Sequence, residues 1–176
     1  SFWFYYTASS AKEAFYIGNT QGWGTCLRLE IFEDRLSLIQ DNREAGGSLL
    51  YTPLLTENNQ VPEAGEWHFV SFATDSSGTR LYIDDALYVQ SAITTWSGQL
   101  NNVNAAYIGR WKRSGNDSFF NGSIDEVRIY DRALSASEVS ALYALERPVS
   151  AAPSAPAHSL TFSLEDANGS QVLSSA

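Results

Sequence analysis

The sequence of 176 residues has no methionine, a single cysteine and no long apolar run. The lone Cys26 excludes an internal disulfide and any zinc site built from cysteines, and we expect it to be a small core residue. No apolar run approaches the roughly 20 residues that a membrane-spanning helix needs, so we expect no membrane insertion. Because the sequence lacks methionine and opens on an apolar strand, we expect it to be a piece of a longer polypeptide with flanking domains.

Basic residues are also scarce. The chain has 11 Lys and Arg residues against 20 Asp and Glu residues, which gives a formal net charge of −9. Such a surface repels phosphate backbones, and no basic stripe with interleaved aromatic residues offsets this repulsion. We therefore expect no nucleic-acid partner. Hydrophobic residues make up 44% of the chain and aromatic residues 13%, which is enough for a packed core.

Strand patterns dominate what is present. Leu27, Leu29 and Ile31 alternate with Arg28 and Glu30, which predicts a strand with one buried and one exposed face. Many short strands at near-regular spacing indicate a β-sandwich or barrel. Further strands are predicted at Phe2–Tyr6, Leu36–Leu38, Trp67–Thr74, Arg80–Asp84, Ala86–Gln90, Ala105–Gly109 and Ile124–Tyr130.

One short helix is predicted near the end of this region. Ser135 and Glu138 have the spacing of a capping box, in which the serine hydroxyl accepts from a free backbone amide and the glutamate reaches back to the cap. Val139, Leu142 and Tyr143 then recur at helical spacing. We expect this face to pack on the sandwich.

The composition changes after Arg147, and this divides the sequence into three parts. Residues 1–147 carry the strand and helix patterns, whereas residues 148–157 hold three prolines and are typical of an extended linker. In residues 158–176, apolar residues alternate toward Asn168-Gly169, a strong hairpin signal. We expect this hairpin to begin a following β domain; the alternative is an edge hairpin of the first domain.

Three segments, in order, resemble the laminin G-like, concanavalin A-like lectin-glucanase family, which includes pentraxin-like jelly rolls. They are GEWHFVSFATDSSGTRLYIDDALYVQS (65–91), AYIGRW (106–111) and FFNGSIDEVRIYDRALSASEVSALY (119–143). The resemblance covers most of residues 1–147. It implies an all-β fold, a two-sheet antiparallel jelly-roll sandwich with one short C-terminal helix. It also implies binding of sugars or proteins, often with calcium and often within larger secreted proteins.

Two departures from the family pattern bear on the expected structure. The family has a strand upstream of the Phe2–Tyr6 strand, and this sequence does not contain it, so its ligand-binding residues cannot be carried over. The family also has glycine after the aspartate of the central hairpin, where the turn needs a positive φ. Asp85 stands there in this chain, so we expect a turn that forms with some strain.

A catalytic interpretation finds little support in the acidic residues. Glycosidases of this fold class carry three carboxylates at alternate positions of one strand, but the positions that follow Asp125 are Val127 and Ile129. Glu30 and Glu33 point to different faces of a strand. We find no carboxylate pair in the facing arrangement that glycoside hydrolysis needs, and we expect no enzyme activity.

Asp125 shares a strand face with apolar residues, so we expect its carboxylate to point inward. A buried carboxylate must be ion-paired, hydrogen-bonded or bound to a metal. One interpretation is a salt bridge, for example to Arg110, or hydrogen bonds to the backbone. The other is a structural calcium ion held by Asp125, Asp117 and Asn116 as oxygen ligands.

The five tryptophans divide into two groups. Trp3 and Trp67 lie within predicted strands, as does Phe69, and are expected in the core. The others lie in or beside polar loops, where an aromatic ring can stack on a sugar; the alternative is that each closes an end of the sandwich. The predicted ligand-binding residues are Trp111, Trp96, Trp23, Arg110 and Asn116.

The sequence therefore predicts a non-catalytic, extracellular binding module of a larger secreted or surface protein, with carbohydrate or a cell-surface glycan as the leading ligand. The alternative is a protein-interaction or spacer domain of an adhesin-like protein, without a sugar site. A divergent glycoside hydrolase or lyase of the same fold is the third hypothesis.

Overall fold

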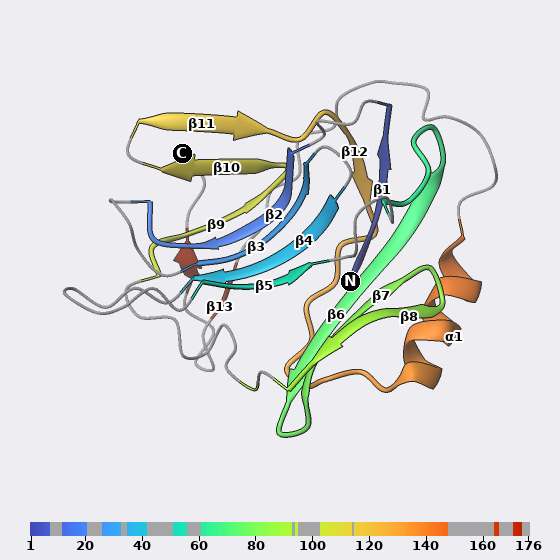
Figure 1. Cartoon of the computed structure of the whole chain (residues 1–176). Coiled ribbons are helices and arrows are strands. Elements are labelled where there is room, and N and C mark those ends of the chain that lie inside the picture. Colours follow the sequence, from blue (N-terminus) through green and yellow to red (C-terminus); the bar gives the residue numbers. More distant parts are fainter. Residues whose placement is uncertain are drawn as a thin grey trace.

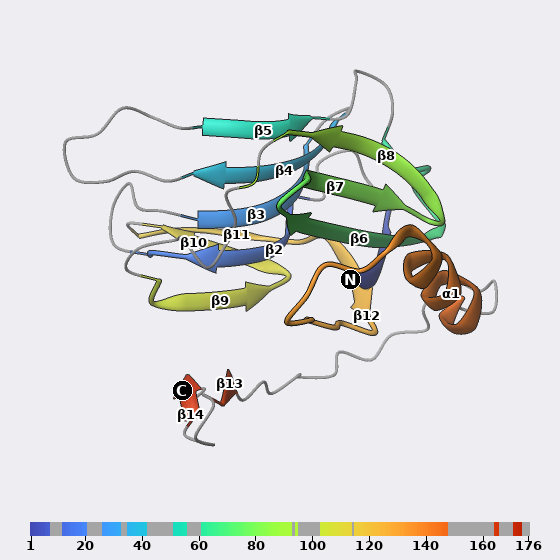
Figure 2. The ribbon, with the colours of Figure 1, turned by 90° about the horizontal axis from the view of Figure 1, so that it is seen from below.

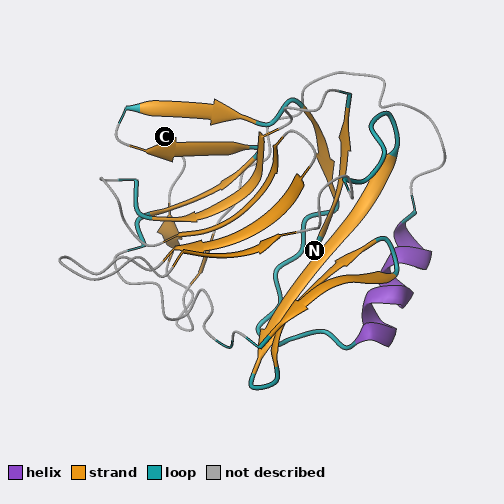
Figure 3. Cartoon of the chain, in the orientation of Figure 1, coloured by secondary structure: helices purple, strands orange, loops and turns teal. Residues whose placement is uncertain are grey.

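The computed structural model describes residues 1–7, 12–20, 26–32, 35–41, 51–55, 61–92, 94, 103–113, 115–147, 164–165 and 171–173. Two five-stranded antiparallel sheets pack face to face, and helix α1 (Ala136–Glu146) lies on the outside of one of them (Figures 1 and 2). The predicted all-β sandwich with one short helix is thus confirmed, as Figure 3 shows by secondary structure.

We call the sheet that carries α1 the helix-side sheet. Its central strand, Trp67–Asp75, pairs with Phe2–Tyr6 on one side and with Gly78–Ile83 on the other. A tight turn from Asp75 to Gly78 joins it to the latter strand. In spatial order this sheet consists of β12 (Gly122–Asp125), β1 (Phe2–Tyr6), β6 (Trp67–Asp75), β7 (Gly78–Ile83) and β8 (Ala86–Ser91).

The opposite sheet is the hairpin-side sheet, because a two-stranded hairpin lies over its outer face. In spatial order it consists of β5 (Tyr51–Leu55), β4 (Arg35–Asp41), β3 (Cys26–Phe32), β2 (Lys12–Gly18) and β9 (Ala105–Ile108). The hairpin itself is formed by β10 (Arg110–Arg113) and β11 (Asn116–Phe119), and both of its strands contact β2. Figure 1 shows this hairpin and α1 on opposite sides of the molecule.

The core lies between the two sheets because alternate side chains of each strand point inward. Its centre combines aromatic residues of β1 with branched residues of the other strands, and Phe4, Leu29, Ile31, Val70 and Leu81 have no measurable exposure. Full burial of one such side chain contributes roughly 1.5–3 kcal/mol. The predicted alternation in β3 is therefore confirmed for its apolar residues.

Two glycines allow local features of the fold that a side chain would prevent or strain, a close strand pairing and a left-handed turn. A Cβ on Gly122 would lie 2.0 Å from the carbonyl oxygen of Tyr5, so only glycine lets β12 pair with β1 here. Gly109 has a φ of +69°, a left-handed conformation that side chains disfavour, and it separates β9 from β10. This turn takes the chain out of the sheet and into the covering hairpin.

Two local predictions were wrong. The closing strand ends at Asp125 instead of Tyr130, because Glu126 has a φ of +51° and breaks the extended backbone. The positive φ of the β7–β8 turn falls on Asp84, at +55°, and not on Asp85. Asp84 compensates for the strain, since its backbone amide and its carboxylate both hydrogen-bond to the backbone of Phe69.

The capped helix is confirmed. The Ser135 hydroxyl accepts from the amide of Glu138, whose carboxylate in turn accepts from the Ser135 amide. Val139 is fully buried, and Leu142 and Tyr143 pack beside it against the outer face of the helix-side sheet. No helix in the described part of the chain combines the length and apolarity needed to cross a bilayer.

The C-terminal hairpin signal is matched by two short antiparallel strands, β13 (Leu164–Glu165) and β14 (Gln171–Leu173). The predicted linker, residues 148–157, lies outside the described residues. The assignment of residues 158–176 to a following domain stays a prediction.

Candidate functional site

The outer face of the hairpin-side sheet carries polar and aromatic side chains. Tyr16 on β2 pairs with Arg28 on β3 and with Tyr107 on β9, so these three side chains form a row across the sheet. The sequence predicted that the Arg28 and Glu30 face would be exposed, and this was wrong: their side chains are only 18% and 19% exposed. One reason is the hairpin, because Trp111 of β10 lies over this face, its ring centre 5.9 Å from the Arg28 guanidinium carbon.

Two carboxylates share the Arg28 guanidinium. Glu13 and Glu30 are cross-strand neighbours on β2 and β3, and their oxygens lie 3.8 and 3.6 Å from the two terminal nitrogens of Arg28. The Glu13 side chain is only 9% exposed. Strand register creates this pair, and no spacing along one strand predicts it.

The ion cluster of Glu13, Arg28 and Glu30 carries more negative than positive charge. Burial raises the pKa of the Glu30 carboxyl, the nearby Arg28 opposes this shift, and the Glu13 carboxylate adds to it. The net direction is upward, so one cation does not fully compensate two partly buried carboxylates.

Four buried polar atoms of the hairpin-side sheet and its covering hairpin have no hydrogen-bond partner. They are Oε2 of Glu13, Nε of Arg28, Nε of Arg110 and Oγ of Ser118. Ser118 is the cross-strand neighbour of Trp111 in the hairpin, and Arg110 precedes Trp111 in β10. Buried polar groups in folded proteins are nearly always satisfied, so the unsatisfied atoms of Glu13, Arg28 and Ser118 on the Trp111 side mark a candidate site for a polar ligand.

Backbone hydrogen bonds at its base and the side chain of Arg110 hold the β10–β11 hairpin in place. The Gly109 amide donates to the carbonyl of Ala14 in β2, and the Phe120 amide donates to the carbonyl of Gly109. The Arg110 guanidinium binds both carboxylate oxygens of Asp117 at 3.1 Å and lies over the ring of Tyr107 at 5.2 Å. Trp111 is thereby held above Arg28.

The structure describes some of the predicted ligand-binding residues but not all of them. Trp111 is half-buried, and Arg110 lies beside it on the same hairpin. Asn116 begins β11, but its side chain lies outside the described part. Trp23 and Trp96 are outside the described residues, so their predicted role stays a prediction. The prediction missed Glu13 and Arg28, which no loop or motif signal marks, and it missed Tyr107, although this residue lies within the AYIGRW motif.

Asp125 does not point into the core as predicted. Its side chain is exposed at the end of β12, and its Oδ1 accepts a hydrogen bond from the Glu126 amide. The strand ends here, so the alternation that predicted an inward carboxylate no longer applies. Arg110 pairs with Asp117 instead of Asp125.

The residues predicted to bind calcium are not gathered by the fold. Asp125 belongs to the helix-side sheet, whereas Asp117 belongs to the hairpin and is occupied by the Arg110 guanidinium. Among the described residues, no group of three or more His, Cys, Asp or Glu side chains could hold a metal ion. Calcium binding by Asp125, Asp117 and Asn116 stays a prediction.

His68 forms a second buried polar cluster, inside the helix-side sheet. Its Nδ1 lies 3.2 Å from Oδ2 of Asp84, and its Nε2 lies 2.9 Å from the carbonyl oxygen of Glu63. Burial lowers the pKa of His68, but the hydrogen bonds to Asp84 and Glu63 outweigh burial, so the net shift is upward. Both ring nitrogens face acceptors, which favours the doubly protonated ring and a structural role.

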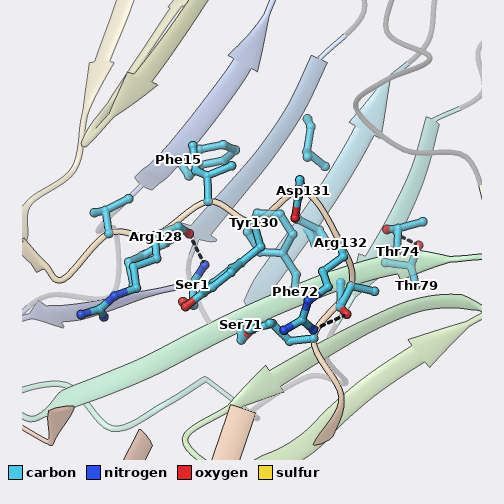
Figure 4. Close-up of a pocket in the computed structure, with 18 of the residues that line it drawn as sticks. Ser1, Phe15, Ser71, Phe72, Thr74, Thr79, Arg128, Tyr130, Asp131 and Arg132 are labelled. Atoms are coloured by element: carbon cyan, nitrogen blue, oxygen red, sulfur yellow. Dashed lines mark hydrogen bonds between the residues drawn. The ribbon is translucent and has the colours of Figure 1, made fainter. Parts of the chain in front are cut away.

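A cavity of about 230 Å³ lies between the sheets, at the end that residues 127–134 close. Figure 4 shows Phe15, Phe72 and Tyr130 around it, with Arg128 and Arg132 on the closing segment. Its walls are mainly core side chains. On its rim, Arg128 pairs with Glu126 and Glu146, and Arg132 pairs with Glu138.

Comparisons with known proteins agree with the architecture. The family model described as the concanavalin A-like lectin/glucanases superfamily matches residues 1–140. The carbohydrate-binding module CBM40 of the Ruminococcus gnavus IT-sialidase, solved with α2,3-sialyllactose, has a TM-score of 0.66 and 16% identity over 81% of this chain and 79% of that one. No curated protein matches the sequence closely enough to count as a relative.

Domain 4 of AbnA, a GH43 extracellular arabinanase from Geobacillus stearothermophilus, was solved in complex with arabinotriose. It has a TM-score of 0.58 and 19% identity over 81% of this chain, which spans 64% of that domain. At these identities both likenesses show the fold alone.

Proposed function

Because the chain belongs to the concanavalin A-like lectin/glucanase superfamily, we propose that it is a non-catalytic carbohydrate-binding module of a secreted or surface protein. Two proteins of similar fold support this proposal, since one was solved with sialyllactose and the other with arabinotriose. Both belong to larger enzymes that act on glycans. We place the binding site on the outer face of the hairpin-side sheet, beneath and beside Trp111.

The observation that carries this proposal is the set of unsatisfied polar atoms around an aromatic ring. A sugar presents hydroxyl groups that donate and accept hydrogen bonds, together with apolar C–H faces that pack on an indole. Glu13 can accept from a hydroxyl, whereas Arg28 can donate to one. The partial exposure of Arg28 and Glu30 gives a ligand access to the cluster.

The same geometry argues against hydrolysis. A glycosidase needs two carboxylates on either side of the scissile bond, about 5 Å or more apart, with the sugar between them. Here both carboxylates lie against the Arg28 guanidinium, which occupies the space that the sugar would need. We expect no turnover of laminarin, agarose or alginate. Hydrolysis that disappears in Glu13→Gln would overturn the non-catalytic part of the proposal.

The test compares two half-buried tryptophans on opposite sheets, Trp111 and Trp67. Binding to an array of oligosaccharides identifies a ligand, and titration calorimetry then gives its dissociation constant. Trp111→Ala should weaken binding about tenfold or more, roughly 1.4 kcal/mol, because the aromatic platform is lost. Trp67→Ala should leave the affinity unchanged, since Trp67 packs against Tyr5 on the helix-side sheet.

Two outcomes would contradict the proposal. If no oligosaccharide or polysaccharide binds the intact chain, the protein-interaction or spacer hypothesis replaces it. If Trp67→Ala and Trp111→Ala weaken binding equally, the site lies elsewhere or the loss reflects general destabilisation. Melting curves of both variants separate these two causes.

A further inference from the structure

The charge distribution around Trp111 restricts the class of glycan, and this inference rests on the proposed function. We infer that the face takes an uncharged glycan and that the buried carboxylate of Glu13 excludes sugars that carry a carboxylate. Glu13 is thus a specificity-determining residue. Its Oε1 faces Arg28, whereas its Oε2 is buried without a hydrogen-bond partner.

An ionised Glu13 can only accept hydrogen bonds. A sugar hydroxyl can donate a hydrogen bond to Oε2 and so supply the partner that this atom lacks. A sugar carboxylate has no proton to donate at neutral pH. The Glu13 side chain is nine-tenths buried, so water screens this repulsion weakly. Glu30 adds a second negative charge on the same face.

Two cations of the sheet face and its hairpin are already engaged. Arg28 lies between Glu13 and Glu30, and Arg110 binds both oxygens of Asp117. Lys112 alternates with Trp111 along β10 and therefore points to the opposite face of the hairpin. An acidic sugar would thus need to displace a carboxylate before it gained an ion pair with Arg28 or Arg110.

This inference separates the chain from one of the proteins that share its fold. The CBM40 domain was solved with sialyllactose, whose sialic acid carries a carboxylate, whereas the arabinanase domain was solved with the neutral arabinotriose. The formal charge of the whole chain, −9, acts in the same direction as the local cluster, because it repels anionic glycans at a distance.

The experiment uses pairs of sugars that differ by a carboxylate. Lactose is compared with 3′-sialyllactose, and methyl-esterified with free oligogalacturonate, by titration calorimetry at two salt concentrations; arabinotriose is an additional neutral probe. The neutral member of a bound pair should bind at least about tenfold tighter. Higher salt should narrow the difference, because ions screen the repulsion.

Glu13→Gln tests the assigned residue, since glutamine keeps the shape and one acceptor but removes the charge. It should reduce the preference for the neutral sugar severalfold, whereas Glu126→Gln, an exposed glutamate on the other sheet, should leave the preference unchanged. If Glu13→Gln does not fold, the salt dependence of the intact chain decides the question.

The outcomes distinguish the two proposals. If neutral and acidic members bind with equal affinity, or the acidic member binds tighter, the inference on ligand class is wrong and the proposed function stands. If the preference persists unchanged in a folded Glu13→Gln variant, the assignment to Glu13 is wrong. If no sugar binds, both the inference and the proposed function fail.

Discussion

The two outer faces of the sandwich are covered in the same way but with different chemistry. On the helix-side sheet, α1 covers Trp3, which is 1% exposed and packs against Phe69 and Tyr143 with ring centres 5.4 and 5.5 Å away. On the hairpin-side sheet, β10 places Trp111 over Arg28, which contacts two carboxylates. One tryptophan is embedded in apolar side chains, and the other borders an ion cluster.

This difference separates stability from recognition. Burial of aromatic surface under α1 stabilises the fold directly, because apolar area leaves water. Buried polar atoms without partners instead cost stability, roughly 1–3 kcal/mol for each such group. Proteins break local rules mainly at functional sites, and the hairpin face, where buried polar atoms meet an ion cluster, is where we place function.

The sharpest test of the comparison is to remove each tryptophan. Trp3→Ala should lower the free energy of unfolding by about 3–5 kcal/mol, because it leaves a cavity between the sheet and α1. Trp111→Ala should cost less than half as much, since its ring is half-buried. Urea denaturation measures both. Equal losses in the two variants would make Trp111 a core residue and remove the distinction between the faces.

A smaller effect is expected at the His68–Asp84 pair. The pKa of His68 is raised in the folded state, so its contribution is complete below the unfolded value near 6.5 and is lost as pH rises through the folded pKa. Asp84→Asn should cost about 1–3 kcal/mol at pH 6 and flatten the pH dependence of the melting temperature. Asp85→Asn, in the same turn, is the control. An unchanged pH profile in Asp84→Asn would show that the pair does not titrate with folding.

Removal of a charge from the ion cluster should raise the stability of the fold, whereas the variants above lower it. Because burial and Glu13 raise the pKa of Glu30, the folded chain binds more protons than the unfolded chain, and stability falls as pH rises through this range. Glu30→Gln should therefore raise the melting temperature at pH 7 but not at pH 3, where the carboxyl is largely protonated in both states. A lower melting temperature at pH 7 would show that attraction to Arg28 outweighs burial.

The smallest effect is expected from calcium. Bound calcium at a hundredfold excess over its dissociation constant would add roughly 2.7 kcal/mol of stability. Since Asp117 is held by Arg110 and Asp125 lies on the other sheet, we expect the same melting curve in EDTA and in calcium. A rise with calcium that Asp125→Asn abolishes would restore a metal site near β12.

Prediction from the sequence worked best where the local pattern was strong. The apolar positions of β3 and the capping box of α1 are signals carried by neighbouring residues, and the structure confirms both. The Lys12–Gly18 strand was missed because Ala14, Phe15 and Tyr16 are all buried, so no apolar–polar alternation marks it. The closing strand was predicted too long because alternation does not report the positive φ of Glu126.

Prediction of the candidate site was also limited to what local sequence patterns can show. Trp111 was found because it follows a strand and opens a polar loop, which is a local signal. Glu13 and Glu30 are 17 positions apart, and their pairing depends on a register shift between Glu13 and Phe15 in β2. A shift of one residue would move one carboxylate to the other face of the sheet, so this pair cannot be predicted from spacing.

The sequence by itself determined the sandwich, the capped helix and the family, because these depend on residue periodicity and on short motifs. Tertiary structure decided which polar groups meet. The left-handed turn at Gly109 takes the hairpin over one sheet, and strand register places Glu13, Arg28 and Glu30 beneath it. Binding chemistry depends on contacts within a few ångströms between distant segments, and only the packed fold creates these contacts.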